Sequence, residues 1–78
     1  MAEVASSADL VAFIAKGIVD DTDAIEVTEV DGGEMLELAT SDDDRGRVIG
    51  RQGRVAKAMR AVLAATPNGR DVRLEIVD

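Results

Sequence analysis

The chain has 78 residues, no cysteine, no histidine and a single aromatic residue, Phe13. This composition excludes zinc sites built on thiolate or imidazole, disulfides, catalysis by a thiol or an imidazole, and stacking of bases on an aromatic platform. Because 46% of the residues are hydrophobic and 32% are charged, we expect one small globular domain with an aliphatic core.

The ends and the hydropathy of the chain suggest a cytoplasmic location. No apolar run approaches the roughly 18 residues that a membrane span needs. The first residues, Met1 to Val4, carry neither the basic nor the apolar region of a secretory signal. We expect residues 1–7 to form a frayed N-terminal segment and residues 8–78 to form a single domain.

The N-terminal third predicts a helix from about Ala8 to Val19. Ser6 is placed to cap this helix, with Asp9 three residues later. Gly17 falls inside the predicted helix, where it costs about 1 kcal/mol relative to alanine. Apolar side chains recur at helical spacing, at Leu10, Val11, Ile14 and Ile18.

Three segments alternate between apolar and polar residues, which is typical of strands. The first covers residues 25–28, the second residues 35–39 and the third residues 72–77. Asp31-Gly32-Gly33 joins the first two as a hairpin, because these residues tolerate positive φ. Pro67-Asn68-Gly69 marks a loop before the third strand.

Residues 42–65 predict two helices separated by a short glycine-containing turn. Acidic residues 42–44 suit the start of the first helix, where the helix dipole favours negative charge. A metal site at these aspartates is the less favoured alternative, because no further ligands accompany them. Residues 50–53, Gly-Arg-Gln-Gly, interrupt the helical pattern, and a second helix follows from about Arg54 to Ala65. On that helix Arg54, Lys57 and Arg60 lie opposite an apolar face formed by Val55, Met59, Val62 and Leu63.

The element order is therefore helix, strand, strand, helix, turn, helix, strand. This α-β-β-α-α-β order predicts an α+β domain in which three helices cover one face of a three-stranded sheet.

The cations are concentrated around the glycine turn. Residues 45–60 contain six arginines and lysines and no acid, although the whole chain has a net charge of −7. Because salt screens charges beyond about 10 Å, such a patch can attract an anion to an acidic protein. A solvated basic helix face is the alternative. The turn itself favours an anion site, because glycine lets a ligand backbone approach and the next helix begins there.

The string from Arg47 to Arg54, Arg-Val-Ile-Gly-Arg-Gln-Gly-Arg, resembles the signature of the K-homology (KH) family. Together with the element order and the closing Val-Arg-Leu-Glu-Ile, it most resembles small bacterial type II KH proteins of the KhpA (YlqC-like) family. Arg51 stands where such proteins commonly have lysine. It keeps the positive charge and adds a planar fork that can bind phosphate through two donors.

The resemblance implies that the turn clamps about four nucleotides of single-stranded RNA, with no cofactor and no metal. It implies a post-transcriptional regulator or an RNA chaperone. By this resemblance Val48, Ile49 and Val55 line an apolar base groove beside a strand, although Ile49 fits the core equally and Val55 fits it better. We expect Arg45 and Arg60 to be solvated. The implied RNA-binding residues are Arg47, Val48, Ile49, Gly50, Arg51, Gln52, Gly53, Arg54 and Lys57.

Two rival functions come from other classes. The resemblance also implies a protein–protein module, either a homodimer or a partner of a larger KH-containing RNA-binding protein, with weak RNA binding or none. An enzyme is disfavoured, because the chain has neither a Walker loop nor a dinucleotide fingerprint.

Overall fold

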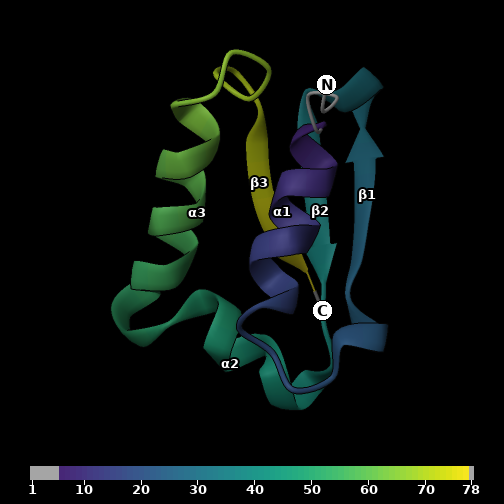
Figure 1. The fold of residues 1–78 in the computed structure, drawn as a ribbon, viewed down its shortest axis with the longest axis vertical. Coiled ribbons are helices and arrows are strands. Elements are labelled where there is room, and N and C mark those ends of the chain that lie inside the picture. The colour runs from purple at the N-terminus through teal and green to yellow at the C-terminus, as the bar shows by residue number, and fades with distance from the viewer. Residues whose placement is uncertain (1–5, 78) are drawn as a thin grey trace, which may run out of the picture.

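The computed structural model describes residues 6–77, which form the predicted α+β domain with three helices and a three-stranded sheet (Figure 1). Short 3-10 turns lie at residues 22–24, 31–33 and 51–53. In chain order the helices and strands are α1 (Ser7–Lys16), β1 (Glu26–Val30), β2 (Met35–Ala39), α2 (Asp42–Ile49), α3 (Arg54–Ala64) and β3 (Arg73–Val77).

The sheet has the order β1-β2-β3. Strands β1 and β2 form an antiparallel hairpin with Thr28 opposite Glu37, and the turn between them has positive φ at Asp31, Gly32 and Gly33. Strand β3 pairs with β2 in parallel, with Leu36 beside Leu74. A parallel pair needs a crossover connection, and α2, the glycine turn and α3 supply it. Because β2 is the central strand of the sheet, β3 is an edge strand.

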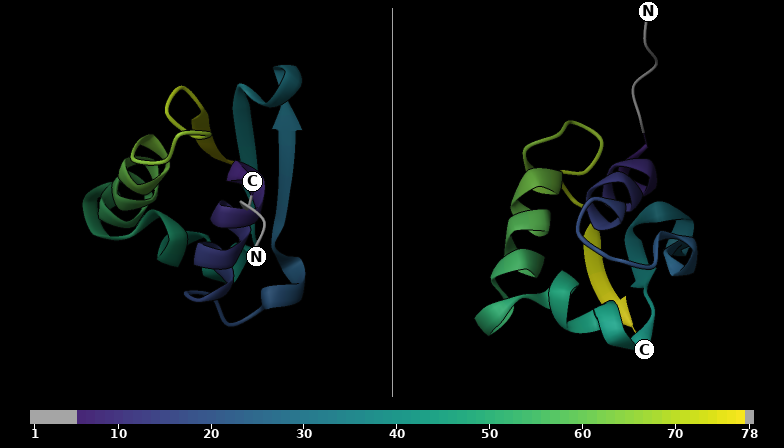
Figure 2. Two further views of the ribbon diagram at one scale, coloured as in Figure 1. Left: turned by 45° about the horizontal axis from the view of Figure 1, so that its top comes forward. Right: turned by 60° about the horizontal axis from the view of Figure 1, so that its bottom comes forward.

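Helices α1 and α3 lie on the same side of the sheet, and α2 lies at the end where β2 leads into it (Figures 1 and 2). Alternate residues of β2 and β3 point toward these helices, which is why Leu36, Leu38 and Leu74 are buried. The helices complete this aliphatic core with Val11, Ala15, Val48, Met59 and Leu63.

The first helix is shorter than the sequence pattern predicts. Ser6 caps it as expected, since its side chain accepts a hydrogen bond from the amide of Asp9 at 3.0 Å. The helix ends at Lys16, however, and Gly17 is its C-terminal cap instead of an interior residue. Val19 remains buried outside the helix. The apolar spacing predicted which residues are buried but not where the helix stops.

The remaining boundaries differ by one or two residues from the predicted ones. Strand β1 runs to Val30, α3 ends at Ala64, and β3 begins at Arg73. The expectation of a frayed segment at residues 1–7 falls largely outside the described residues, since the description begins at Ser6. In the described range 6–77, no helix is both long and apolar enough to span a bilayer.

Candidate nucleic-acid interface

Helix α2 is anchored at its start by a side chain from the preceding loop. The Ser41 hydroxyl accepts a hydrogen bond from the Asp44 amide and donates one to the Asp44 carboxylate at 3.0 Å. Asp42 pairs instead with Arg45 on the helix surface, at 2.8 Å. The acidic run is therefore a helix start, as the sequence predicts, and Asp42 and Asp44 have different partners.

Asp44 ties α2 to the loop that follows α1. Asp44 is 3% exposed, and its carboxylate accepts hydrogen bonds from the amides of Asp20 and Asp21, at 3.3 and 3.0 Å. The amide of Asp21 lowers the pKa of Asp44 below its ordinary value. Burial opposes this shift, while the Asp20 amide, the Ser41 hydroxyl and the Arg47 charge add to it. Asp44 thus holds in place the helix that leads into the glycine turn.

This contact predicts an acid-sensitive stability. Because the folded state holds Asp44 ionised at a lower pH than the unfolded state does, its contribution is complete above the unfolded pKa of about 3.9. The contribution is lost as the pH falls through the lower folded pKa. We expect Asp44→Asn to lower the melting temperature at neutral pH and to lose less stability than the wild type on acidification.

Urea unfolding at several pH values between about 6 and about 2 measures this difference. Asp43→Asn is the matched control, because Asp43 is exposed in the same helical turn. On acidification, Asp43→Asn should lose as much stability as the wild type does. Equal acid sensitivity in the wild type and in Asp44→Asn would show that this carboxylate does not couple stability to pH.

Arg47 forms ion pairs with two acidic side chains. Its Nη1 lies 2.8 Å from a carboxylate oxygen of Asp20 and 3.8 Å from one of Asp44. The hydrogen bond and the negative charge of Asp20 raise the pKa of Arg47. Half of the side chain remains exposed. Arg47 therefore helps to hold the α1–β1 loop against α2, and Asp20 compensates part of its charge.

The two apolar residues before the turn lie in different environments. Val48 is fully buried in the core, so we leave it out of the contact surface that the sequence implied. Ile49 is the last residue of α2 and is 37% exposed next to Gly50. Of the two, only Ile49 is available to a ligand without a change in the core.

The backbone conformation of the glycine turn, Gly50–Gly53, restricts which residue types can occupy its first and last positions. Gly50 adopts φ 78° and ψ 170°, a conformation that is accessible almost only to glycine. A Cβ there would lie 2.5 Å from Val55 Cγ2 and 2.7 Å from the Val55 nitrogen. Gly53 has φ 75° and open space around its Cα. Gly50 thus permits close packing of the turn on α3, and Gly53 permits the left-handed step into that helix.

The residues between the two glycines are exposed. Gln52 also has positive φ and accepts a hydrogen bond from the Arg54 guanidinium at 3.3 Å. The turn is closed from within, since the amide of Gly53 donates to the Gly50 carbonyl. Within residues 6–77 no side chain caps the first turn of α3. Arg51 and Arg54 therefore lie next to Gly53, at a helix N-terminus that no described side chain caps.

Arg54, Lys57 and Arg60 form a basic ridge along α3. Their spacing of three residues carries the ridge gradually around the helix, from the glycine turn toward β3. Arg60 reaches the edge strand, where its Nε donates to the Leu74 carbonyl at 3.1 Å. Arg60 is exposed, as expected, but one of its donors is also bound to the sheet.

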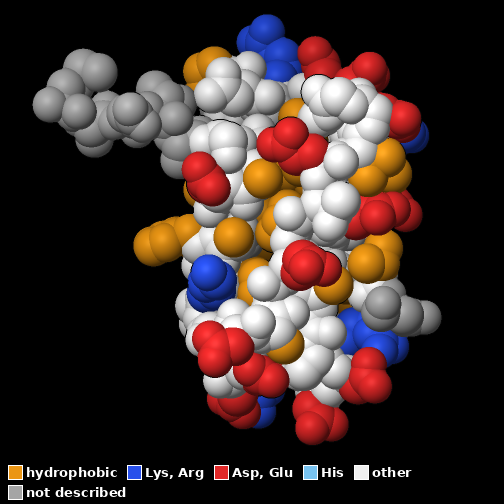
Figure 3. Space-filling model, turned by 90° about the vertical axis from the view of Figure 1, so that its right-hand side faces the viewer, with side chains coloured by type: hydrophobic (Ala, Val, Ile, Leu, Met, Phe, Trp, Pro, Cys, Tyr) orange, Lys and Arg blue, Asp and Glu red, His pale blue; other side chains and the backbone are white. Residues whose placement is uncertain are grey.

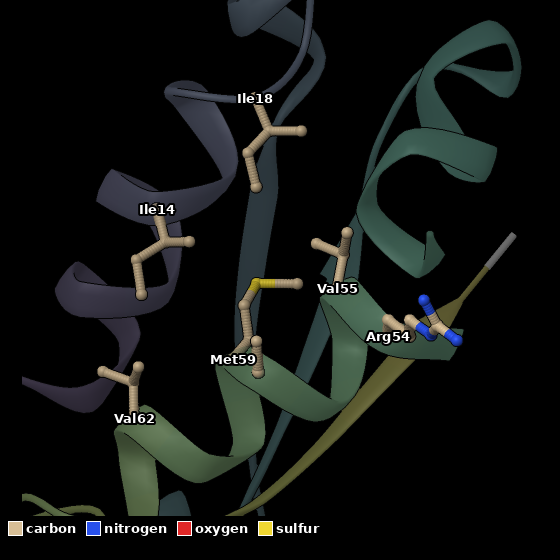
Figure 4. A pocket seen from close by; sticks show the side chains of 7 residues that line it. Ile14, Ile18, Arg54, Val55, Met59 and Val62 are labelled. Atoms are coloured by element: carbon tan, nitrogen blue, oxygen red, sulfur yellow. The ribbon is translucent and has the colours of Figure 1, made fainter. Parts of the chain in front are cut away.

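Two hollows of different chemistry flank α3. The helix-side hollow, between α1 and α3, has a volume of about 250 Å³. Figure 4 shows Ile14, Ile18, Val55, Met59 and Val62 facing it, whereas the Arg54 guanidinium points away. The strand-side hollow, of about 280 Å³, lies between α3 and β3. Its lining residues are Arg60, Val72, Arg73, Leu74 and Glu75.

The residues of the base groove that the family resemblance implies are therefore distributed over two separate hollows. Val55 lines the helix-side hollow, which strand residues do not line. The strand residues lie in the strand-side hollow together with Arg60, a residue that sequence reasoning left out. The signal that could have found Arg60 is its position three residues after Lys57 on the ridge. For Asp44 the signal is the spacing of Ser41 and Asp44, which suits a helix cap.

The acidic side chains gather on another face of the protein. Figure 3 looks at the β1 side of the domain, which is the side opposite α3 in Figure 1, and there carboxylates outnumber cations. The basic ridge and the glycine turn lie at the α3 side. This separation gives the domain a dipolar charge distribution that would orient an approaching polyanion toward the turn.

The chain is similar to known bacterial proteins over most of its length. It is 51% identical to the RNA-binding protein KhpA of Halalkalibacterium halodurans over 73 residues, which cover 88% of this chain and 96% of the relative. It is 46% identical to KhpA of Leifsonia xyli over 67 residues, 83% of this chain and 88% of the relative. No solved structure matches the chain significantly.

The more distant KhpA of Borreliella burgdorferi is 39% identical over 82 aligned positions that cover both chains completely. Residues 8–76 match the KH domain of the KhpA/KhpB family. This match extends from the second residue of α1 to the fourth residue of β3 and includes the glycine turn between α2 and α3. The relatives are named as RNA-binding proteins and not as enzymes. The chain therefore belongs to the KhpA/KhpB family of KH domains.

Proposed function

We propose that this protein binds RNA by clamping a short single-stranded segment at the glycine turn. The observation that carries the proposal is an exposed turn between two helices that contains Arg51 and is followed by Arg54, on a domain that is otherwise acidic. Family members with these elements are named as RNA-binding proteins. We propose that it acts in the cytoplasm, as a post-transcriptional regulator or an RNA chaperone.

The turn suits a sugar-phosphate backbone better than a single base. Gly53 has open space where a Cβ would stand, so a ligand backbone can approach there, and the dipole of α3 favours negative charge at this end. Arg51, Arg54 and Lys57 add charge-assisted hydrogen bonds to phosphate oxygens. Arg47 contributes less in this account, because Asp20 already pairs with it.

The bases then continue toward the strand-side hollow. Bases carry hydrogen-bonding edges, and this hollow offers polar groups on Arg60 and Glu75 beside apolar Val72. The helix-side hollow is lined almost entirely by aliphatic side chains, where a base edge would lose its hydrogen bonds to water. Ile49, exposed at the end of α2, can contact a base or a ribose next to the turn.

Salt dependence tests the phosphate clamp. If about four phosphates are neutralised, the logarithm of the association constant should fall with the logarithm of salt concentration at a slope of about −3. Arg51→Gln should make this slope less negative by about 0.7. Fluorescence anisotropy of a labelled oligoribonucleotide over a salt series measures both values, and a slope near zero would exclude a clamp of this kind.

We also propose that the protein self-associates through the helix-side hollow. Val62 is 43% exposed beside this hollow, so one copy can insert an aliphatic side chain where the other copy has space. A two-fold arrangement makes such a contact reciprocal. A domain of this size gains stability by burying more apolar surface in this way.

Substitution of Val62 tests self-association separately from RNA binding. We expect Val62→Asp to shift a dimer to a monomer in sedimentation velocity, because burying an unpaired carboxylate is costly. Ala64→Asp on the exposed end of the same helix is the control and should leave the dimer intact. A wild-type protein that remains monomeric at high micromolar concentration would contradict this second proposal.

A further inference from the structure

Arg60 is held in a fixed position at the strand-side hollow. Its Nε donates to the carbonyl of Leu74, on the edge strand β3, at 3.1 Å. The guanidinium group is planar, so one hydrogen bond at Nε also restrains the direction of the Nη groups. Among residues 6–77, no acid lies within ion-pair distance of Arg60. The Nη donors therefore remain for a ligand in the hollow, which Arg60 itself lines.

The surroundings of Arg60 suit a base better than a phosphate. Glu75 lines the same hollow, and its carboxylate repels a phosphate but can accept hydrogen bonds from the N–H groups of a base. The apolar side chain against which a flat ring can pack is that of Val72, because the Leu74 side chain is buried in the core. A volume of about 280 Å³ is at the lower end for small-molecule sites and leaves room for a single heterocycle rather than a long ligand.

The hollow lies within reach of a strand held at the glycine turn. Arg60 follows Gly53 by seven residues along α3, which corresponds to about 10 Å of helix. Lys57 stands between them on the basic ridge and can hold a phosphate on the way. A strand of a few nucleotides that is clamped at Arg51 can therefore place one of its bases beside Arg60.

We propose that Arg60 determines base specificity, selecting a cytosine or a guanine in the strand-side hollow. A restrained guanidinium group offers parallel donors, and its best partner is a base with two adjacent acceptors on one edge. Cytosine has O2 and N3, and guanine has O6 and N7. Adenine has no such pair, because its N6 amino group flanks both N1 and N7. In uracil the N3–H group separates O4 from O2.

This inference rests on the proposed RNA binding, and it adds a preference that a phosphate clamp alone would not have. A clamp at the turn reads charge and backbone, so it holds all four bases equally. Arg60 adds one two-donor contact to a base edge. Such a contact corresponds to roughly a fivefold to hundredfold difference in affinity.

Four short RNAs test the inference without knowledge of the binding register. Hexanucleotides of adenosine, uridine and cytidine are compared with one that alternates adenosine and guanosine, at neutral pH and fixed salt. For the wild type we expect the cytidine and guanosine RNAs to bind about tenfold more tightly than the adenosine and uridine RNAs. Equal affinities for all four would overturn the specificity proposal while leaving RNA binding at the turn intact.

Arg60→Lys separates specificity from charge. Lysine keeps the positive charge but lacks the planar fork, so the preference should disappear while the salt slope stays unchanged. Lys57→Gln is the matched control on the same ridge, and it should weaken all four RNAs by the same factor. A preference that persists in Arg60→Lys would overturn the assignment to Arg60. Failure of every RNA to bind would remove both this inference and the proposed function.

Discussion

Replacing Gly50 by alanine is expected to destabilise the whole domain by about 4 kcal/mol. Two causes add. The new Cβ would lie 2.7 Å from the backbone nitrogen of Val55, which cannot move away without shifting the start of α3. In addition, φ 78° with ψ 170° is a conformation that alanine adopts only under strain. Since a domain of this size is stabilised by roughly 4–12 kcal/mol, the substitution should remove about a third or more of the total stability.

Two other glycines provide the controls for this prediction. Gly53→Ala should cost only about 1 kcal/mol, because its φ of 75° is strained for alanine but the space around it is open. Gly46→Ala, inside α2 and free of close contacts, should raise the stability by about 1 kcal/mol. Urea unfolding followed by circular dichroism gives all three values. A Gly50→Ala protein as stable as Gly53→Ala would show that the turn is not packed on Val55 in the way described.

The difference between the two glycines matters for testing function. A Gly50 variant that fails to bind RNA would report on folding as much as on binding. The residues between the glycines are the better choice, because Arg51 and Gln52 are exposed and contribute nothing to the core.

Replacing Arg51 and Gln52 together by aspartate is expected to abolish RNA binding in a folded protein. The change removes one positive charge and adds two negative charges where the phosphates would lie, so the affinity should fall by at least about a hundredfold at physiological salt. Gln52 has φ 57°, and aspartate is among the residues that tolerate this left-handed conformation. The melting temperature should therefore change little. Anisotropy titrations and thermal melting measure the two effects.

A matched variant controls for net charge. Lys16→Asp combined with Thr28→Asp changes the charge by the same amount at exposed positions outside the glycine turn and the basic ridge. We expect it to bind RNA several-fold more weakly than the wild type but far more tightly than the turn variant, since only long-range attraction is reduced. Equal losses in the two double variants would mean that binding follows overall charge and that the turn is not the site.

Much of the fold could be predicted because each element follows one local rule. Alternation gave β2 its correct bounds, from Met35 to Ala39. The spacing of Val55, Met59, Val62 and Leu63 identified the side of α3 that faces the core, although Val62 is 43% exposed. Helix α1 was predicted three residues too long at its C-terminal end. Its apolar spacing continues through Ile18 and Val19, and the chain turns only because Gly17 caps the helix and Asp44 holds the loop beyond it.

The site was less predictable, because its geometry depends on contacts between distant segments. Arg47 follows the basic pattern of the turn, but its partner Asp20 comes from another loop, and spacing along the chain does not reveal such a pair. The same holds for Arg60, which is bound to the carbonyl of Leu74 fourteen residues later. Val48 belongs to the motif and lies in the core, so membership of a motif did not imply exposure.

The most direct measurement is an NMR titration of the nitrogen-15-labelled protein with a short single-stranded oligoribonucleotide. The account predicts the largest shifts at the amides of residues 50–54, with smaller shifts along α3 at Lys57 and Arg60. Residues of β1, which lie on the acidic side, should stay unchanged. Shifts confined to the residues of the helix-side hollow, or no shifts at millimolar RNA, would contradict the account.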